Sequence, residues 1–149
     1  MMPRQVMVET APTMIAFDFY DGVIEGIGRN ILCYDEAYFT MLAWDDTQDM
    51  RVFAVLPLEH GALDRLLALY AAFEAPPQSE TWMPRPYPIP EVDTIIATAR
   101  ARIPEEAVLV QALHVTDRPT AKRKVAATDR VRIERIFSTR GFGAVNEWF

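Results

Sequence analysis

Apolar residues alternate with polar ones, or run together in short blocks, through most of the first sixty positions of the chain. Two such blocks, residues 15–20 and 23–27, flank the dipeptide Asp21-Gly22. Asp-Gly between alternating apolar runs is the strongest short-range signal for a β-hairpin, because a type I′ turn requires positive φ at both central positions. The turn sets the register and predicts three facing pairs: Tyr20 with Val23, Phe19 with Ile24, and Asp18 with Glu25.

The strand-like pattern continues to residue 58, with β-branched and aromatic residues of the kind that a pleated surface favours. Its further blocks are residues 30–34, 37–44 and 50–56, separated by an Asp35-Glu36 turn and a polar loop at residues 45–49. Gly26 and Gly28 interrupt the second strand and predict a bulge or bend there. Because the connections are short, we expect four or five antiparallel strands in a curled, barrel-like meander.

A helical period follows this strand-rich region, residues 14–58. Residues 61–74 place one apolar stripe at helical spacing, which predicts a helix that covers the sheet. The stripe consists of Leu63, Leu66, Leu67, Tyr70 and Phe73. Prolines then fill residues 76–90 and end the helix, since proline cannot continue one. Alternating prolines predict an extended crossover, and Trp82 and Tyr87 predict that it is pinned across the domain rather than free.

The C-terminal part, residues 91–149, is predicted to be mostly helical. One helix is expected over residues 91–103, and another begins at Thr128 or Asp129 and ends at Gly141. Between them, residues 107–115 are a buried strand or a short helix, and their valines favour the strand. The aromatic tail, residues 142–149, is expected to dock on the domain or on another subunit. The whole chain is therefore predicted to be a single α+β domain.

Length and composition are those of one soluble domain. The chain has 149 residues, half of them hydrophobic, which is ample for one buried core. No stretch approaches the roughly 18 apolar residues of a membrane-spanning helix, and the N-terminus does not read as a signal peptide, so we expect a cytoplasmic protein. The single cysteine, Cys33, is expected to be a buried structural thiol. Thirteen arginines against two lysines indicate a GC-rich, bacterial coding background.

Charge is divided unevenly along the chain. The formal net charge is −6. Residues 1–75 carry twelve acids and four bases, a net charge of −8, whereas residues 76–149 carry nine acids and eleven bases, a net charge of +2. An acidic balance argues against nonspecific nucleic-acid binding, which depends on neutralising phosphates. A basic stretch, residues 118–140, is predicted to be a charged surface face, with phosphate or the acidic half of a second copy as alternative contacts.

The facing carboxylates Asp18 and Glu25 are the most informative candidate site. Like charges directly opposite on a sheet are destabilising, so water, an arginine, a bound cation or a partner must offset them. Adjacent carboxylates also raise one pKa and can serve as an acid and a base. No other catalytic group accompanies them in the sequence, so contact with a basic partner is the favoured interpretation.

Other candidate chemistry is weak. His60 and His114 are the only histidines, and neither has the neighbours of a metal site. His60 is expected to help the first helix begin, and His114 to be a hydrogen-bonded core or interface residue. Neither serine has the setting of an activated nucleophile, and no glycine-rich phosphate cradle is present. Three acids of one loop, Asp45, Asp46 and Asp49, could hold a hard cation, but a solvated loop is favoured.

Two functions from different classes remain. The first is a non-catalytic, acidic bacterial protein that covers a basic site on a partner, as immunity proteins, antitoxins and secretion chaperones do; the analogy rests on size and charge alone. We expect no metal, cofactor or membrane, a basic protein partner, and a homodimer between the acidic N-terminal half and the basic C-terminal stretch. The candidate contact residues are Asp18, Tyr20, Glu25, Tyr38, Trp44, Asp45, Asp46 and Asp49.

The alternative is a small-molecule binder or enzyme. Its pocket would lie at the mouth of the curled sheet and would use Asp18, Glu25 and either Tyr20 or His60. A sheet interior filled by Phe17, Phe19, Ile24 and Phe39 would count against this alternative.

Overall fold

A computed structural model describes residues 14–19, 22–45, 47, 49–72, 89–139 and 141–149. These residues form one antiparallel sheet in which six strands follow one another in sequence order. The strands are β1 (Met14–Phe19), β2 (Val23–Ile31), β3 (Tyr34–Asp45), β4 (Met50–Pro57), β5 (Val108–Ala112) and β6 (Ala121–Lys124). The helices are α2 (Ala62–Ala72), α3 (Pro90–Glu106) and α4 (Arg130–Thr139), with short 3-10 turns η1 (Ala127–Asp129) and η2 (Val145–Glu147).

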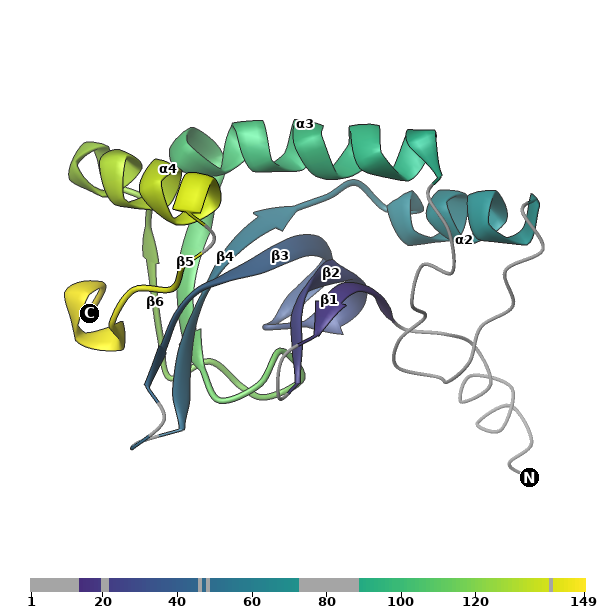
Figure 1. The fold of residues 1–149 in the computed structure, drawn as a ribbon. Helices are drawn as coiled ribbons and strands as arrows, with labels where there is room; N and C mark the ends of the chain where they lie inside the picture. Colours follow the sequence, from purple (N-terminus) through teal and green to yellow (C-terminus); the bar gives the residue numbers. More distant parts are fainter. Residues whose placement is uncertain (1–13, 20–21, 46, 48, 73–88, 140) are drawn as a thin grey trace, which may run out of the picture.

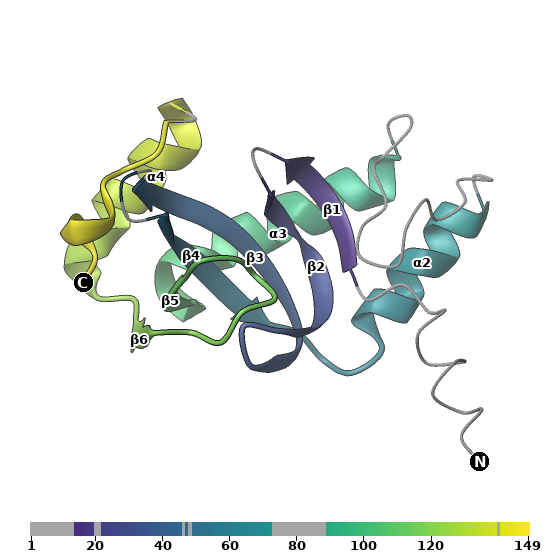
Figure 2. The same cartoon turned by 90° about the horizontal axis from the view of Figure 1, so that it is seen from below.

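The α+β class is confirmed, and the sheet is curled but not closed into a barrel (Figures 1 and 2). The four N-terminal strands were expected. The C-terminal part contributes two more, β5 and β6, so the strand interpretation of residues 107–115 is confirmed for Val108–Ala112. α3 runs through Pro104 to Glu106, three residues beyond its predicted end. The predicted crossover, with Trp82 and Tyr87, lies outside the described residues except for its last two positions.

The first hairpin brings Asp18 opposite Glu25, as predicted. Phe19 pairs with Val23 rather than with Ile24, because the register shifts on both sides of Asp18. The first shift leaves Phe17 as an extra residue in β1, and the second leaves Ile24 as an extra residue in β2. Gly26 and Gly28 themselves pair regularly, so the irregularity of β2 lies at Ile24 rather than at either glycine. Gly26 serves a different purpose, since a Cβ atom there would lie 2.4 Å from the carbonyl oxygen of Ile15. Only glycine allows β1 to approach β2 so closely.

The second hairpin turns at Leu32 and Cys33, not at Asp35-Glu36, which belong to β3. Leu32 and Cys33 have φ values of 49° and 68°, and their neighbours Ile31 and Tyr34 pair across the turn. Positive φ costs roughly 1–2 kcal/mol for a residue with a Cβ atom. Burial of Leu32, whose N–H also donates to Val115 O at 3.0 Å, offsets this cost. Cys33 points outward and is exposed, so the expectation of a buried thiol was wrong.

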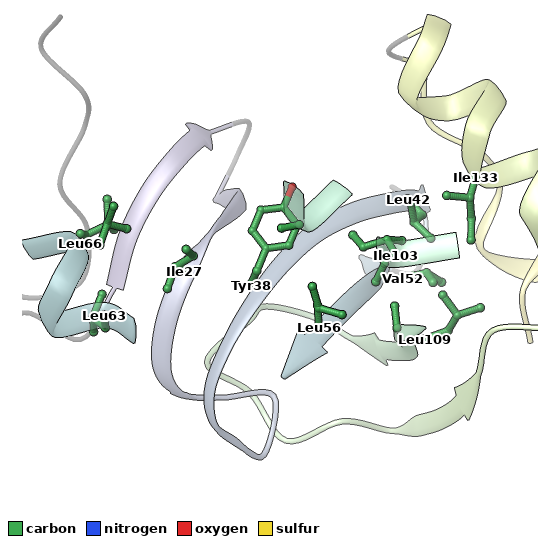
Figure 3. Close-up of a cluster of buried hydrophobic side chains, with 14 of the residues drawn as sticks. Ile27, Tyr38, Leu42, Val52, Leu56, Leu63, Leu66, Ile103, Leu109 and Ile133 are labelled. Atoms are coloured by element: carbon green, nitrogen blue, oxygen red, sulfur yellow. The ribbon is translucent and has the colours of Figure 1, made fainter. Parts of the chain in front are cut away.

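The sheet has an apolar core on each face. On one face, α2, α3 and α4 cover the sheet and bury residues such as Ile27, Tyr38 and Leu109 (Figures 1 and 3). On the other face, Phe39 and Phe53 meet edge to face with ring centroids 6.0 Å apart, within a cluster of fully buried apolar side chains. Apolar residues on both sides of each inner strand thus find cover, which explains the near-continuous apolar runs in the sequence.

The aromatic tail, residues 142–149, docks on the domain, which was one of the two alternatives predicted for it. Gly143 exchanges backbone hydrogen bonds with Leu42 and Trp44, at 2.9 and 3.4 Å. Val145 and Trp148 are buried against the helix-covered face. This docking leaves Phe142 partly exposed between α4 and the sheet.

Candidate functional site

Glu25 lies at the centre of a buried polar cluster that joins β2, β3 and α3. Its carboxylate accepts hydrogen bonds from Arg100 Nε and Nη2, both at 2.9 Å, and a short one from the Tyr38 hydroxyl. Glu25 is 5% exposed and Tyr38 is fully buried, whereas the side chain of Arg100 is one-third exposed. Arg100 is therefore the group that offsets the Glu25 charge, one of the four possibilities that the sequence left open.

The electrostatics of this cluster keep Tyr38 and Arg100 protonated. Burial raises the pKa of Tyr38 well above its usual range, and the neighbouring Glu25 charge raises it further. Burial alone would lower the pKa of Arg100, but Glu25 and Tyr38 outweigh it, and the net direction is upward. Tyr38 thus stays a neutral donor and Arg100 stays a cation at every physiological pH.

Two hollows meet above the Glu25–Arg100 pair. The larger, called here the acid groove, has a volume of about 510 Å³. It is lined by Phe17, Asp18, Glu25, Asp93, Ile96, Ala97 and Arg100. The smaller hollow, of about 60 Å³, shares Asp18, Glu25 and Arg100 with it and extends toward Ile136, Phe137 and Phe142. Three carboxylates and one guanidinium line the acid groove, so its charged lining is net negative.

The structure divides the predicted contact residues into two groups. Asp18, Glu25 and Tyr38 come together at the acid groove or directly beneath it. Trp44, Asp45 and Asp49 lie instead at the far end of β3 and the start of β4, and none of them lines either hollow. Asp45 accepts hydrogen bonds from the backbone and hydroxyl of Thr47, as a turn residue does. Tyr20 and Asp46 lie outside the described residues.

Sequence reasoning missed Asp93 and Arg100, which complete the acid groove from α3. They lie 68 and 75 positions from Glu25, and their spacing on the helix carries no recognisable motif. The signal that could have found Arg100 was the unfavourable facing of Asp18 and Glu25, because that pair requires a cation from some distant part of the chain.

A second buried carboxylate, Glu36, lies at the start of α2, close to His60. Glu36 accepts the N–H groups of Gly61 and Leu63, both at 2.8 Å, and so caps the start of α2. Burial alone would raise the pKa of Glu36, but these two hydrogen bonds hold it below its usual value. His60 is largely exposed, 3.5 Å from Glu36, and lines neither hollow. It therefore has no place in a pocket that uses Asp18 and Glu25.

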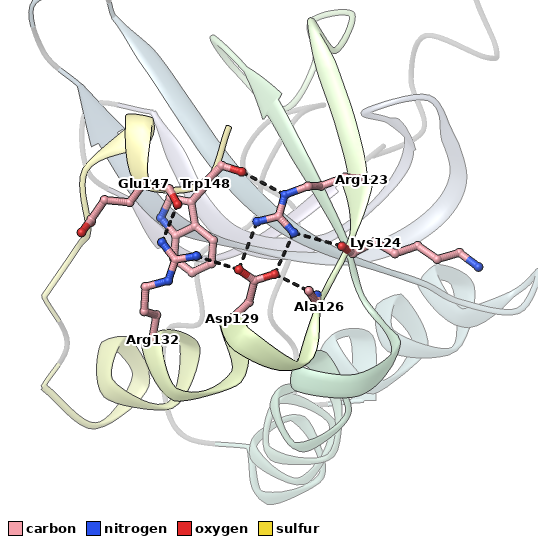
Figure 4. A network of polar contacts seen from close by, with 7 residues as sticks. All are labelled: Arg123, Lys124, Ala126, Asp129, Arg132, Glu147 and Trp148. Atoms are coloured by element: carbon pink, nitrogen blue, oxygen red, sulfur yellow. Dashed lines mark hydrogen bonds and ion pairs between the residues drawn. The ribbon is translucent and has the colours of Figure 1, made fainter.

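A third buried carboxylate, Asp129, holds the C-terminal part together (Figure 4). It accepts two hydrogen bonds from Arg123, one from Arg132 and one from the N–H of Ala126, at 2.7 to 3.0 Å. The hydrogen bonds from Arg123 lower the pKa of Asp129 to about 2. Arg132 also lies over the Trp148 ring at 4.3 Å. We call this arrangement the Asp129 clasp.

The Asp129 clasp uses arginines of the basic stretch, residues 118–140, for contacts within the molecule. Arg123 and Arg132 are committed to Asp129, Arg130 lies 3.5 Å from Glu105, and Lys122 lies over the Tyr34 ring. A nucleic-acid contact through these four residues would therefore compete with intramolecular contacts.

The residues described contain no cluster of three or more histidine, cysteine, aspartate or glutamate side chains suited to a metal ion. In the same ranges, no helix has the length and apolar character needed to span a membrane. Comparisons of the chain with protein-family models, with curated proteins and with solved structures found no match.

Proposed function

We propose that this protein is a non-catalytic binding module whose acid groove receives a basic segment of a partner protein. The observation that carries the proposal is that three carboxylates line one groove: Asp18 from β1, Asp93 from α3 and Glu25 from β2. These carboxylates come from distant parts of the sequence, and the fold gathers them around one recess with apolar walls. Complementary charge in such a recess steers and orients a basic partner.

The state of Glu25 argues against acid–base chemistry at this site. Both carboxylate oxygens already accept hydrogen bonds, Oε1 from Arg100 and Oε2 from Arg100 and Tyr38. A general base must accept a proton from substrate, and a general acid must first hold one. A guanidinium and a phenol occupy both oxygens of Glu25, so its role is to fix the floor of the groove.

The walls of the acid groove suit a long basic side chain. Phe17, Ile96 and Ala97 contribute apolar surface beside the carboxylates. Lysine and arginine bury their aliphatic stems on apolar surface while the charged end meets an acid. Aromatic and charged groups together in a recess are also the composition of interface hot spots.

The test is copurification with charge-reversed variants. Tagged wild-type protein, Asp18→Lys and Asp93→Lys are isolated gently from the natural source, and the complexes are weighed by native mass spectrometry. Glu134→Lys is the matched control, because Glu134 is exposed on α4 and lines neither hollow. We expect a stoichiometric protein partner with the wild type and the control, and its loss with both groove variants.

A zero-length carbodiimide cross-link then locates the contact, because this reagent joins carboxylates only to amines that touch them. We expect Asp18 or Asp93 to be joined to a lysine of the partner. A partner that survives both reversals, or that cross-links only elsewhere, contradicts the proposal.

A small cationic ligand is the second candidate for the same groove. Its volume of about 510 Å³ lies in the range of small-molecule sites. A small added mass in place of a protein partner, lost in Asp18→Lys and kept in Glu134→Lys, would favour this candidate over the first.

A further inference from the structure

The acid groove continues into a second, oppositely charged recess. The smaller hollow beside Glu25 ends at Ile136 and Phe142, and these two residues also line a hollow of about 350 Å³ between α4 and the docked tail. We call this the basic hollow; Arg132, Arg135, Glu147 and Trp148 contribute to its walls. The three recesses therefore form one surface track from Asp93 to Arg135.

Arg135 is the available cation of the basic hollow. Arg132 is bound to Asp129 and to the carbonyl of Glu147. Arg135, one helical turn further along α4, is exposed, and its guanidinium has no hydrogen bond or ion pair within the described ranges. A guanidinium at the edge of a recess is well suited to meet a carboxylate of another molecule.

The centre of the track is apolar. Phe142 is 44% exposed and Ile136 is half-buried beside it. Phe142 is one of only three exposed large apolar residues in the described part of the chain. The order along the track is thus acidic end, exposed apolar centre, basic end.

This order is self-complementary. In a two-fold symmetric dimer, a patch meets a second copy of itself, and residue i contacts j wherever j contacts i. A two-fold axis through the apolar centre would place the acid groove of each copy against Arg135 of the other. We propose that the track is the interface of a symmetric homodimer, with Phe142 near its axis. The inference rests on the proposed function, because it names a second copy of this chain as a basic partner of the acid groove.

The test is a charge swap read by sedimentation equilibrium between about 1 µM and about 1 mM, the range of weak to moderate association. Asp18→Lys and Arg135→Glu each place like charges opposite one another twice per dimer. We expect each to weaken dimerisation at least about tenfold. The combined variant exchanges the two charges and should recover most of the wild-type association.

Matched controls separate this effect from net charge. Glu134→Lys is the control for Asp18→Lys, and Lys124→Glu is the control for Arg135→Glu. Both control residues are exposed and line none of the three recesses. The controls should leave dimerisation unchanged, and Phe142→Ser should weaken it without altering the far-ultraviolet spectrum.

The outcomes are decisive in each direction. Recovery in the combined variant supports the dimer. A wild-type protein that stays monomeric throughout, or a dimer that tolerates both single reversals, overturns it. Monomeric wild-type protein whose basic partner still depends on Asp18 and Asp93 would remove the dimer and leave the proposed function intact.

Discussion

Glu25 and Asp129 are both buried carboxylates held by arginine, yet their surroundings differ. Asp129 is 1% exposed and receives four hydrogen bonds, from two arginines and one backbone N–H. Glu25 is 5% exposed and has one arginine and one tyrosine, and it lines two hollows. The Asp129 clasp joins β6, α4 and the tail, whereas the Glu25 cluster joins core elements at the floor of a groove.

The difference separates a structural ion pair from the proposed binding site in this molecule. Asp129 is surrounded by donors of its own chain, and none of the hollows described above includes it. Glu25 also has its donors, but Asp18 and Asp93 extend the negative charge outward from it into a recess. Both sites pair a buried carboxylate with arginine, and they differ in whether the carboxylate borders a recess that another molecule can enter.

Removal of Asp129 should give the largest loss of stability. Asp129→Ala leaves Arg123 and Arg132 without their shared anion, and breaking a buried pair in this way costs roughly 3–5 kcal/mol. Both arginines are about one-third exposed, so we expect about 3 kcal/mol, the lower end of that range. Urea unfolding measures it, with Glu134→Ala as control. A loss below about 0.5 kcal/mol, the usual scale for a surface site, would show that the clasp has no structural role.

Acid should weaken the clasp selectively. The folded pKa of Asp129 is about 2, below its usual value of 3.8, so its contribution is complete above about pH 5 and is lost as the pH falls from there through about 2. The lowered pKa corresponds to about 2 kcal/mol at neutral pH. The stability difference between the wild type and Asp129→Asn should therefore shrink between pH 6 and pH 2. A difference that stays constant over this range would contradict the assignment.

Glu25→Gln should cost less than removal of Asp129. The amide keeps one acceptor for Tyr38, and Arg100 can be solvated through the groove because a third of its side chain is already exposed. We expect a loss of about 1.5 kcal/mol, near the value of one charged hydrogen bond. Guanidinium unfolding of Glu25→Gln and Asp129→Asn side by side tests the ranking. Equal losses of stability would mean that solvent cannot reach Arg100 in the Glu25 variant any better than it reaches the arginines of the clasp.

Charge reversal in the groove walls should have the smallest effect on stability. Asp18 and Asp93 are exposed, and exposed substitutions usually change stability by less than about 0.5 kcal/mol. Asp18→Lys and Asp93→Lys should therefore melt close to the wild type while losing the partner. A large drop in melting temperature for either variant would show that these carboxylates support the fold rather than recognition.

The sequence predicted those parts of the fold that depend on local patterns. The Asp21-Gly22 signal placed Asp18 opposite Glu25, and the apolar stripe of residues 61–74 placed α2. The turn at Leu32 and Cys33 could not be predicted, because neither residue favours positive φ. Tertiary contacts, including the burial of Leu32, hold that turn against local preference.

Only the β-hairpin residues of the candidate site were predictable from the sequence. Asp18 and Glu25 are joined by a short turn, so the sequence predicted that they face each other, although the pairing shifts on both sides of Asp18. Asp93 and Arg100 reach the groove because α3 crosses the sheet, which no local signal encodes. The sequence placed the start of a helix at Thr128 or Asp129, and the structure adds two arginines bound to Asp129, one of them from β6. Long-range ion pairs of this kind depend on packing that a single sequence does not display.

Carboxylate footprinting tests the central contrast most directly. A carbodiimide with a small amine labels carboxylates in proportion to their exposure, and peptide mass spectrometry reads each site in the free protein and in its complex. We predict that Asp18 and Asp93 are labelled in the free monomer and protected in the complex. Glu134 should be labelled in both states and Asp129 in neither. Equal labelling of Asp18 and Asp93 in both states would contradict the assignment of the acid groove as the recognition site.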